Sequence, residues 1–554
     1  MSDSRHSLPP ELESQSEWER HFERWFEAHF NLAAILMLTS GFLIRLRAAW
    51  GTFLNPDEAL HYLLANQSSW RLAYRASLTN AHPPLLTFVL YFWRALGDSE
   101  FVLRLPSVIA GTAFCWIVFK WLTRIFGQTT GFIGLMLVTF LPPIVGLAAE
   151  VRQYALLLFF LASTAYLLER ALAENSASMM LASAMSLCLA MLAHYSAILF
   201  ASAIGVYSLL RMITRRPAGR LWADWIVGQT GALALFAFLY ITHISRLKGD
   251  YAAGTINGWL GNSFFRPGHD NPLIFVIARS GGVFQYMFGQ LAVGDVAFMA
   301  FITGVVLLWR EKASPSDLNV TSWQLGTLLV LPFAVGAAAS LGRIYPYGGT
   351  RHSAFLIMFA VAGVSFFLAR LVKQRIGRGI VLAILVVAVC NLFGKPHRPY
   401  MLPEDQGRMQ MIGAMEFIQS QIPQSDVIFV DYQTRLLLAH YLCPQQPISF
   451  NPPGARLDEF RCSGYQIVAT DSELYTFTAE NFPRWWDELL RLHPLQPSQS
   501  VWIIQAGWEV YLAHDLPNKS PQFGDLNAQL FGRNITIFKL AVDQSMPGIG
   551  ARPN

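Results

Sequence analysis

The chain has 554 residues, of which 53% are hydrophobic and only 14% are charged. Soluble domains carry roughly 25% charged residues, so this composition excludes a soluble globular protein and predicts a mainly α-helical polytopic membrane protein. The net charge of +5 is modest and no Lys/Arg run resembles a nucleic-acid-binding arm, so we expect no nucleic-acid partner.

The N-terminal segment, residues 1–29, is polar and lacks the short basic region of a cleavable signal. We therefore expect the first apolar run to act as an uncleaved signal anchor. Aromatic residues recur at helical spacing just before it, at Trp18, Phe22, Trp25, Phe26 and Phe30. This spacing predicts an amphipathic helix at the cytoplasmic membrane surface, with a disordered tail as the alternative.

Apolar runs then follow one another along most of the chain, and we interpret them as about eleven membrane spans. They lie near residues 30–48, 105–125, 129–147, 153–170, 178–193, 196–213, 224–244, 281–309, 322–341, 353–371 and 379–393. The long run at 281–309 is expected to be tilted or broken near Gly294. We assign residues 30–393 to one transmembrane catalytic domain, with residues 49–104 as its first outer loop.

Basic residues in short loops predict which side of the membrane each loop faces. They gather in alternate loops, at Lys120, Arg124, Arg170, Arg211, Arg215, Arg216, Arg220, Arg310, Lys312, Arg370, Lys373, Arg375 and Arg378. This pattern places the N-terminus in the cytoplasm, and eleven spans place the C-terminus outside an inner or plasma membrane. Arginines in the predicted outer loops, Arg71, Arg75, Arg104, Arg152 and Arg351, need another explanation.

The composition changes after Asn391, where short β-rich runs begin to alternate with helical ones. The β-rich runs lie at 427–430, 466–469, 501–504 and 535–538, and the helical ones at 436–442 and 485–492. The alternation predicts a C-terminal extracytoplasmic α/β domain over residues 394–554, without a glycine-rich nucleotide loop. Whether Cys443 and Cys462 pair there is left open, because pairing depends on an oxidising compartment.

An Asp-Glu pair, Asp57 and Glu58, follows the first span within the segment that begins at Asn55. One interpretation is a helix start, with Asn55 as the N-cap, Pro56 in the first turn and acids at the positive end of the helix. The other is catalysis, because an ionised carboxylate fixed at a membrane face is a competent general base.

Further polar residues fall in turns that the topology places on the same face. They are His82 before two prolines, Arg104, Glu150 with Arg152 and Tyr154, His194 with Tyr195, and Tyr347 with Arg351. Structural alternatives remain for each: Arg104 can extend to lipid headgroups, Glu150 can pair with Arg152, and histidines at span ends are often interfacial. Because ionisable residues concentrate at one end of the bundle, we predict a site there.

The succession NPDEALHYLL, HPPLLTFVLYFW, GDSEFVLRLPSVIAG and EVRQYALLL resembles the GT-C superfamily of integral-membrane glycosyltransferases. The most similar group contains the lipid A aminoarabinose transferase, the protein O-mannosyltransferases and lipopolysaccharide sugar transferases of the cell envelope. The resemblance implies that Asp57, with Glu58 beside it, is the catalytic base. It also places Arg104 and Glu150 in the active-site region, and leaves Arg71, Arg75 and His82 as candidates for the donor phosphate.

The expected donor is therefore a sugar on polyprenyl or dolichyl phosphate, used without a nucleotide. Asp57 takes the proton of the acceptor hydroxyl, and Arg104 and Arg152, with Arg351 as a further candidate, offset the charge of the leaving phosphate. The product is inverted because one base acts in a single displacement. The residues require no metal cofactor, although a divalent ion is possible because some relatives use one. A transporter or flippase of lipid-linked sugars is the main rival, a non-catalytic scaffold is another, and the glycan, lipid or protein acceptor is unassigned.

Overall fold

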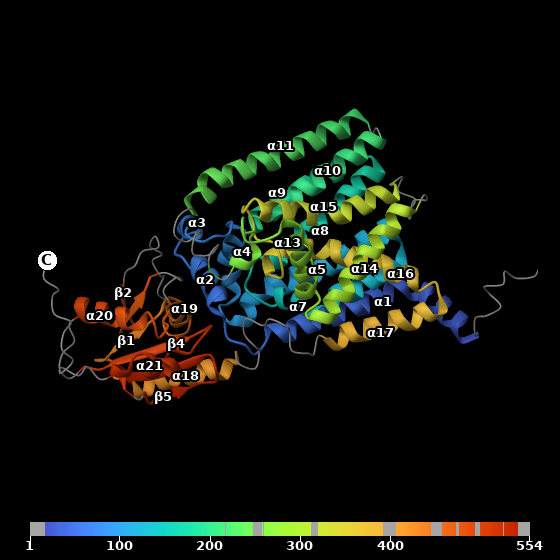
Figure 1. Cartoon of the computed structure of the whole chain (residues 1–554). Coiled ribbons are helices and arrows are strands. Elements are labelled where there is room, and N and C mark those ends of the chain that lie inside the picture. The colour runs from blue at the N-terminus through green and yellow to red at the C-terminus, as the bar shows by residue number, and fades with distance from the viewer. Residues whose placement is uncertain are drawn as a thin grey trace, which may run out of the picture.

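The computed structural model describes residues 17–215, 218–247, 258, 260–311, 320–391, 406–444, 457–471, 476–493, 499–524 and 526–540. Within these ranges the chain forms a bundle of membrane helices and, beyond it, a small mixed sheet (Figure 1). The first helix, α1, runs from Glu17 to Ala49 and is kinked at His29. The helical segment expected before the first span is therefore present from Glu17 onward.

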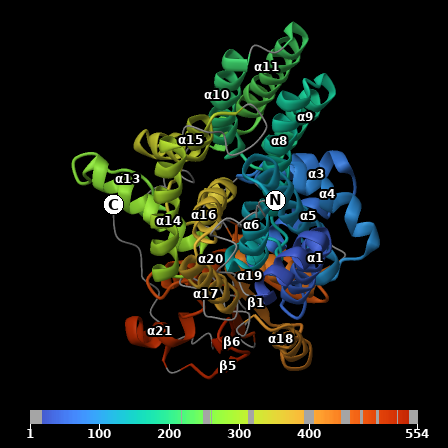
Figure 2. The ribbon, with the colours of Figure 1, turned by 90° about the vertical axis from the view of Figure 1, so that its right-hand side faces the viewer.

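Eight described helices are long and apolar enough to cross a membrane. They are α1, α5 (Glu100–Phe126), α8 (Tyr154–Glu174), α10 (Ala197–Arg215), α11 (Gly219–Thr242), α14 (Leu291–Arg310), α15 (Ser322–Leu341) and α16 (Ile357–Leu371), the last counted together with the helical turn that begins at Arg351. Shorter apolar helices are α6 (Gln128–Phe140), α9 (Ala177–Ala193) and α17 (Arg375–Asn391). Figure 2 shows α16 in the middle of the bundle, where it contacts α14 and α6. The mainly helical membrane fold is confirmed, and each predicted apolar run is helical.

Two predicted spans are broken, each for an identifiable reason. The run at 129–147 divides into α6 and α7 (Pro142–Leu147), because the prolines that follow Leu141 cannot continue the hydrogen bonding of α6. The run at 281–309 divides into α13 (Pro272–Met287) and α14 at residues 288–290. Gly294 lies just after this break, and a Cβ atom there would be 2.3 Å from the backbone of Gln285. Because glycine has no side chain, Gly294 allows α13 and α14 to approach closely.

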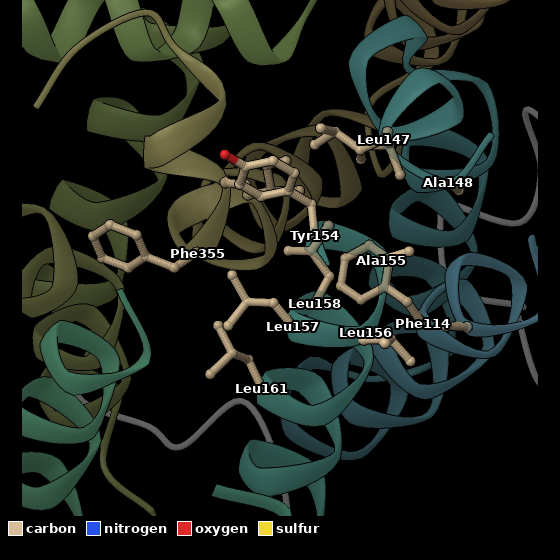
Figure 3. Close-up of a cluster of buried hydrophobic side chains, with 14 of the residues drawn as sticks. Phe114, Leu147, Ala148, Tyr154, Ala155, Leu156, Leu157, Leu158, Leu161 and Phe355 are labelled. Atoms are coloured by element: carbon tan, nitrogen blue, oxygen red, sulfur yellow. The ribbon is translucent and has the colours of Figure 1, made fainter. Parts of the chain in front are cut away.

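The interior of the bundle is formed by apolar side chains from helices distant in sequence. Figure 3 shows one such cluster around the beginning of α8, where Leu157 and Leu161 lie near Phe355 and Phe114 lies near Leu156. These side chains are almost completely buried. In a bilayer the hydrophobic effect does not drive helices to associate, because lipid tails are as apolar as the side chains. The close packing of these side chains therefore holds the helices together.

The segment 49–104, which the sequence predicts to be the first outer loop, contains short helices that Figure 1 shows between the bundle and the sheet. They are α2 (Pro56–Ala65), α3 (Trp70–Ser77), α4 (Leu85–Trp93) and the short η1 (Arg94–Leu96). Helix α2 contacts both α3 and α4, and on another side it contacts α19 (Tyr432–Tyr441) of the C-terminal region. The loop is thus an ordered layer whose first helix carries the Asp-Glu pair.

The C-terminal region contains a six-stranded sheet with the order β2-β3-β1-β4-β6-β5. Its strands are β1 (Val427–Val430), β2 (Leu457–Cys462), β3 (Tyr465–Thr470), β4 (Val501–Ala506), β5 (Ala528–Leu530) and β6 (Ile535–Leu540). Strand β1 is parallel to β3 and β4, and the remaining pairs are antiparallel. Helices α18 (Arg408–Gln421), α20 (Phe482–Leu492) and α21 (Leu512–Lys519) accompany α19. The predicted small α/β fold is confirmed, whereas the predicted start at 394 lies outside the described residues.

Cys443 and Cys462 form a disulfide whose Cα atoms are 5.6 Å apart. The bond joins the residues just after α19 to the end of β2. The pairing that the sequence left open is therefore present, and Cys115, Cys188 and Cys390 are free.

Helix α19 and the carboxyl end of β4 lie against the beginning of α2. The Tyr441 hydroxyl accepts a hydrogen bond from the Leu54 amide at 2.7 Å and donates one to Glu100 at 3.0 Å. Gly507, just after β4, has φ +120° and lies so close to Pro56 that a Cβ atom would be 2.7 Å from the proline ring. These contacts fix the position of the helix that begins at Pro56.

Candidate active site

The beginning of α2 uses its two acids differently. Asn55 caps the helix by accepting a hydrogen bond from the Glu58 amide at 3.0 Å, and the Glu58 carboxylate accepts from the Asn55 amide at 2.9 Å. This reciprocal capping satisfies two amide groups that have no partner inside the helix. The interpretation as a helix start is therefore correct for Asn55 and Glu58. Asp57 does not take part in the cap.

Glu58 is completely buried and pairs with Arg104 through both carboxylate oxygens, at 2.8 and 2.7 Å. It also accepts a hydrogen bond from the Val151 amide at 2.9 Å. All three side-chain nitrogens of Arg104 donate to Glu58, to Thr52 or to backbone carbonyls of residues 49–53. The geometry thus argues against the expected direct roles of Glu58 in catalysis and of Arg104 at a phosphate. They join the first outer loop to α5 and to the 148–153 turn.

Asp57 receives two arginines from distant parts of the chain. Arg152, just before α8, and Arg351, at the end of the 342–350 turn, both donate to Oδ2 of Asp57, the latter at 2.8 Å. Oδ1 of Asp57 has no hydrogen-bond partner among the described residues, and the side chain is 18% exposed. Burial alone would raise the pKa of Asp57, but the two arginine charges outweigh it and lower this pKa to about 2.

Glu150 is the third carboxylate of this region and stands on the same turn as Arg152. The predicted pair between Glu150 and Arg152 is not formed, because Arg152 turns to Asp57 instead. Burial, together with the nearby charge of Glu58, raises the pKa of Glu150 to about 7. Near neutral pH the cluster therefore holds an ionised Asp57 and a Glu150 that is divided between its two protonation states.

Four histidines form a row beside this cluster, and we call His61, His82, His194 and His352 the imidazole row. The ring centroids are 5.6 Å apart for His61 and His82, 5.4 Å for His82 and His194, and 6.5 Å for His194 and His352. Tyr154 adjoins the row, with its ring 5.2 Å from that of His194. His82, His194 and Tyr154 were predicted site residues, and the structure brings them together.

Two members of the row, His61 and His352, were missed by the sequence interpretation. His61 lies four residues after Asp57, so the two share one face of α2. His352 directly follows Arg351. The sequence signal that could have identified them is their short spacing from residues already predicted to lie in the site, Asp57 and Arg351. Lone histidines carry little weight in a sequence, and only the fold brings these four rings next to one another.

The other predicted residues lie elsewhere. The Tyr195 hydroxyl hydrogen-bonds His243, whose other ring nitrogen bonds the Asn80 carbonyl at 2.7 Å. The Tyr347 hydroxyl pairs with that of Ser280 at 2.7 Å. These contacts support the loops that carry His82 and Arg351. Arg71 and Arg75 are exposed on α3, and among the described residues no hydrogen bond or ion pair joins either of them to the Asp57 cluster.

The chemistry available at this end of the bundle follows from these groups. Two guanidinium groups attract an anion with two or more oxygens, because each offers a planar fork of donors. An ionised carboxylate with one unoccupied oxygen can accept a proton. Across the described ranges, no group of three or more His, Cys, Asp or Glu side chains could hold a metal ion.

Comparison with known proteins agrees with this picture. Residues 81–241 match the family model of dolichyl-phosphate-mannose-protein mannosyltransferases. A search of curated protein sequences finds no significant match. Among solved structures, ArnT from Cupriavidus metallidurans bound to undecaprenyl phosphate has a TM-score of 0.51 and 12% identity, covering 93% of this chain and 99% of that chain.

A second ArnT structure from the same organism, in the apo state, has a TM-score of 0.49 and 11% identity, covering 93% of this chain and 100% of that chain. The Archaeoglobus fulgidus oligosaccharyltransferase tethered to an acceptor peptide has a TM-score of 0.44 and 9% identity, covering 75% of this chain. The chain spans only 63% of the length of that archaeal enzyme. The resemblance to GT-C enzymes that the motifs indicated is confirmed.

Proposed function

We propose that this chain, a membrane glycosyltransferase of the GT-C type, moves a sugar from a polyprenyl-phosphate donor to an acceptor at the extracytoplasmic face. Asp57 acts as the general base and the product is inverted. The observation that carries the proposal is the arrangement of Arg152 and Arg351 around a single oxygen of Asp57. This arrangement combines a base and two phosphate-binding groups in one place.

The charges of the cluster support a monophosphate donor. Glu58 and Arg104 neutralise each other, and Asp57 neutralises one of its two arginines. One positive charge therefore remains while Glu150 is protonated, as it is in part near neutral pH, and a sugar phosphodiester of a lipid carries one negative charge. Arg152 and Arg351 can bind the phosphate while they still hold Oδ2 of Asp57, because a guanidinium group has five N–H donors.

The reaction then proceeds in one displacement. Oδ1 of Asp57 takes the proton of the acceptor hydroxyl, and the acceptor oxygen forms a bond to the anomeric carbon. The bond from that carbon to the phosphate oxygen breaks, and its electron pair stays on the phosphate. Arg152 and Arg351 stabilise this developing charge, which is usually the largest single contribution to catalysis.

The rival reading, a transporter of lipid-linked sugars, places its coupling charges near the middle of the bilayer on broken helices. Asp57 instead lies in the short helix α2 between the spans α1 and α5, and Glu150 and Arg152 lie in the turn just before α8. This location favours chemistry at a membrane surface. The resemblance to lipopolysaccharide-modifying enzymes supports a glycan or lipid acceptor, with a protein acceptor as the alternative.

The test is donor consumption by the purified protein in detergent. Undecaprenyl phosphate carrying each of several sugars is incubated with the protein and a cell-envelope extract as acceptor, and mass spectrometry follows donor and product. We expect one donor to be converted to undecaprenyl phosphate, with its sugar on an extract component in the inverted configuration. Movement of the intact donor across reconstituted vesicles without cleavage would support the transporter instead.

A further inference from the structure

We propose that the imidazole row binds the transferred sugar through its hydroxyl groups, while Arg152 and Arg351 bind the phosphate. The inference rests on the proposed function and deepens it, because it assigns the two halves of the donor to two different sets of residues. The row is His61, His82, His194 and His352, and the ring of Tyr154 adjoins it.

The row is assembled from four separate segments. His61 belongs to α2, His82 precedes α4, His194 lies between α9 and α10, and His352 lies in the short η4 helix (Arg351–Leu356) before α16. It starts one helical turn from Asp57 and ends on the residue after Arg351. A sugar held along the row would therefore lie next to the phosphate-binding arginines and the base, as the reacting half of the donor must.

The row offers hydrogen-bonding groups that the protein itself does not use. Among the described residues, His61 and His82 have no hydrogen-bond partner. The Ser196 amide donates to Nδ1 of His194 at 3.1 Å, so Nδ1 is the acceptor and Nε2 of the neutral ring carries a hydrogen. The buried hydroxyl of Tyr154 and both amide atoms of the neighbouring Gln153 also have no partner in the described chain.

Buried polar groups are normally paired, because an unpaired one costs roughly 1–3 kcal/mol. The buried atoms left unpaired here are the Tyr154 hydroxyl and both amide atoms of Gln153, whereas His82 is only half-buried. A ligand with several hydrogen-bond donors and acceptors would supply partners for these groups. Sugar hydroxyl groups do so, because each one both donates and accepts.

The charge state of the row fits a sugar better than a phosphate. Burial, helped by the Arg152 charge, lowers the pKa of His61 and His194 to about 3 and lowers the pKa of His82 well below its usual value. These rings are therefore neutral at physiological pH, and each offers one donor and one acceptor. The permanent positive charge is confined to the arginines, which leaves the phosphate to them.

The experiment compares binding of the bare lipid phosphate with use of the sugar-bearing donor. The variants His61→Phe and His82→Phe keep an aromatic ring but lose its hydrogen bonds, and His82→Asn restores a donor and an acceptor. His269→Phe, at an exposed loop position, is the matched control. Affinity for undecaprenyl phosphate is measured by calorimetry in detergent, and the KM is measured for the donor that the wild-type protein consumes.

Each lost hydrogen bond is worth roughly 1 kcal/mol, so we expect each Phe variant to raise the donor KM about fivefold or more, or to lower kcat/KM by a similar factor. The affinity for undecaprenyl phosphate should change less than about twofold, and His82→Asn should recover part of the loss. Equal weakening of both ligands, or no effect on either, overturns the assignment of the row. If the wild-type protein neither binds undecaprenyl phosphate nor consumes any donor, the proposed function fails first.

Discussion

Asp57 presents one oxygen to two arginines and leaves the other without a protein partner. The two oxygens therefore have different functions. The contacts of Oδ2 with the arginines hold the side chain in place, while Oδ1 remains able to take a proton. Glu58, one residue later, is enclosed by Arg104 and backbone groups. Adjacent acids with the same chemistry therefore have different roles, which their surroundings alone determine.

Replacement of Arg152 by glutamine tests the role of the arginines at the leaving phosphate. We expect kcat to fall by about 10²–10³-fold, because a preorganised donor at a site of developing charge contributes that much to a rate. Arg484→Gln, on the exposed face of α20, is the matched control and should keep wild-type kcat. The kcat of each variant is measured by mass spectrometry at saturating donor. A normal kcat for Arg152→Gln would show that Arg152 does not stabilise the leaving phosphate.

The pair of Glu58 and Arg104 should matter for stability. Glu58→Gln leaves the Arg104 charge buried without its counter-ion, so we expect a loss of about 3–5 kcal/mol in the free energy of unfolding. Glu174→Gln removes the carboxylate of exposed pairs with Arg124 and Arg170 and should cost less than about 1 kcal/mol. Denaturant unfolding in detergent measures both, and equal losses would contradict the structural role of Glu58.

Glu150 gives the stability a defined pH dependence. Its pKa is raised from 4.5 to about 7, so the folded protein holds this proton more tightly than the unfolded chain. The resulting stabilisation is complete below pH 4.5 and is lost as the pH rises through about 7. The thermal midpoint of the wild-type protein should fall over this window more steeply than that of Glu150→Gln. Parallel curves for the two proteins would show that Glu150 titrates normally.

At the level of elements, α2 connects the Asp57 cluster to the C-terminal sheet. Its first turn carries Asp57, while Gly507 and Tyr441 contact the residues just before and at its beginning. The C-terminal region thus contributes to the position of the base although it supplies none of the cluster's charges. This arrangement gives the sheet a positioning role beyond any part it has in choosing an acceptor.

Substitution of Gly507 tests this positioning. Gly507→Ala places a Cβ atom 2.7 Å from the Pro56 ring and strains the backbone at φ +120°, so α2 must shift. Gly524→Ala is a matched control, because Gly524 also has a positive φ but no atom within 4 Å of such a Cβ. We expect kcat to fall about tenfold or more for Gly507→Ala and to stay near the wild-type value for Gly524→Ala. Similar kcat values for the two variants would show that the C-terminal sheet does not position Asp57.

The sequence was informative about elements wherever a periodic pattern was long. Each predicted apolar run is helical over most of its described length, and the four predicted strands, β3, β1, β4 and β6, are the four central strands of the sheet. Strands β2 and β5 were missed because both are edge strands, β2 with a charged sequence and β5 with only three residues. The break before Gly294 was placed a few residues late, since the approach of two backbones leaves little trace in a sequence.

For the whole molecule, the site was predictable only in part. The motifs identified Asp57, Arg152, Arg351 and several rings as neighbours, because alternating topology brings such turns to one face. They did not reveal that Arg104 is enclosed by Glu58 and carbonyl groups, nor that His61 and His352 complete a row. Such contacts join segments far apart in the chain, as Arg104 and Glu58 are at a separation of 46 residues, and no local pattern encodes them.

The most direct measurement of the central claim compares wild-type protein with Asp57→Asn in a single-turnover assay, using the donor identified by the panel. Asp98→Asn, an exposed acid of the same outer loop, is the control. We expect Asp57→Asn to bind undecaprenyl phosphate as the wild type does, yet to transfer sugar at least about 10²-fold more slowly, whereas Asp98→Asn transfers normally. Transfer by Asp57→Asn at the wild-type rate would contradict the claim that Asp57 is the base.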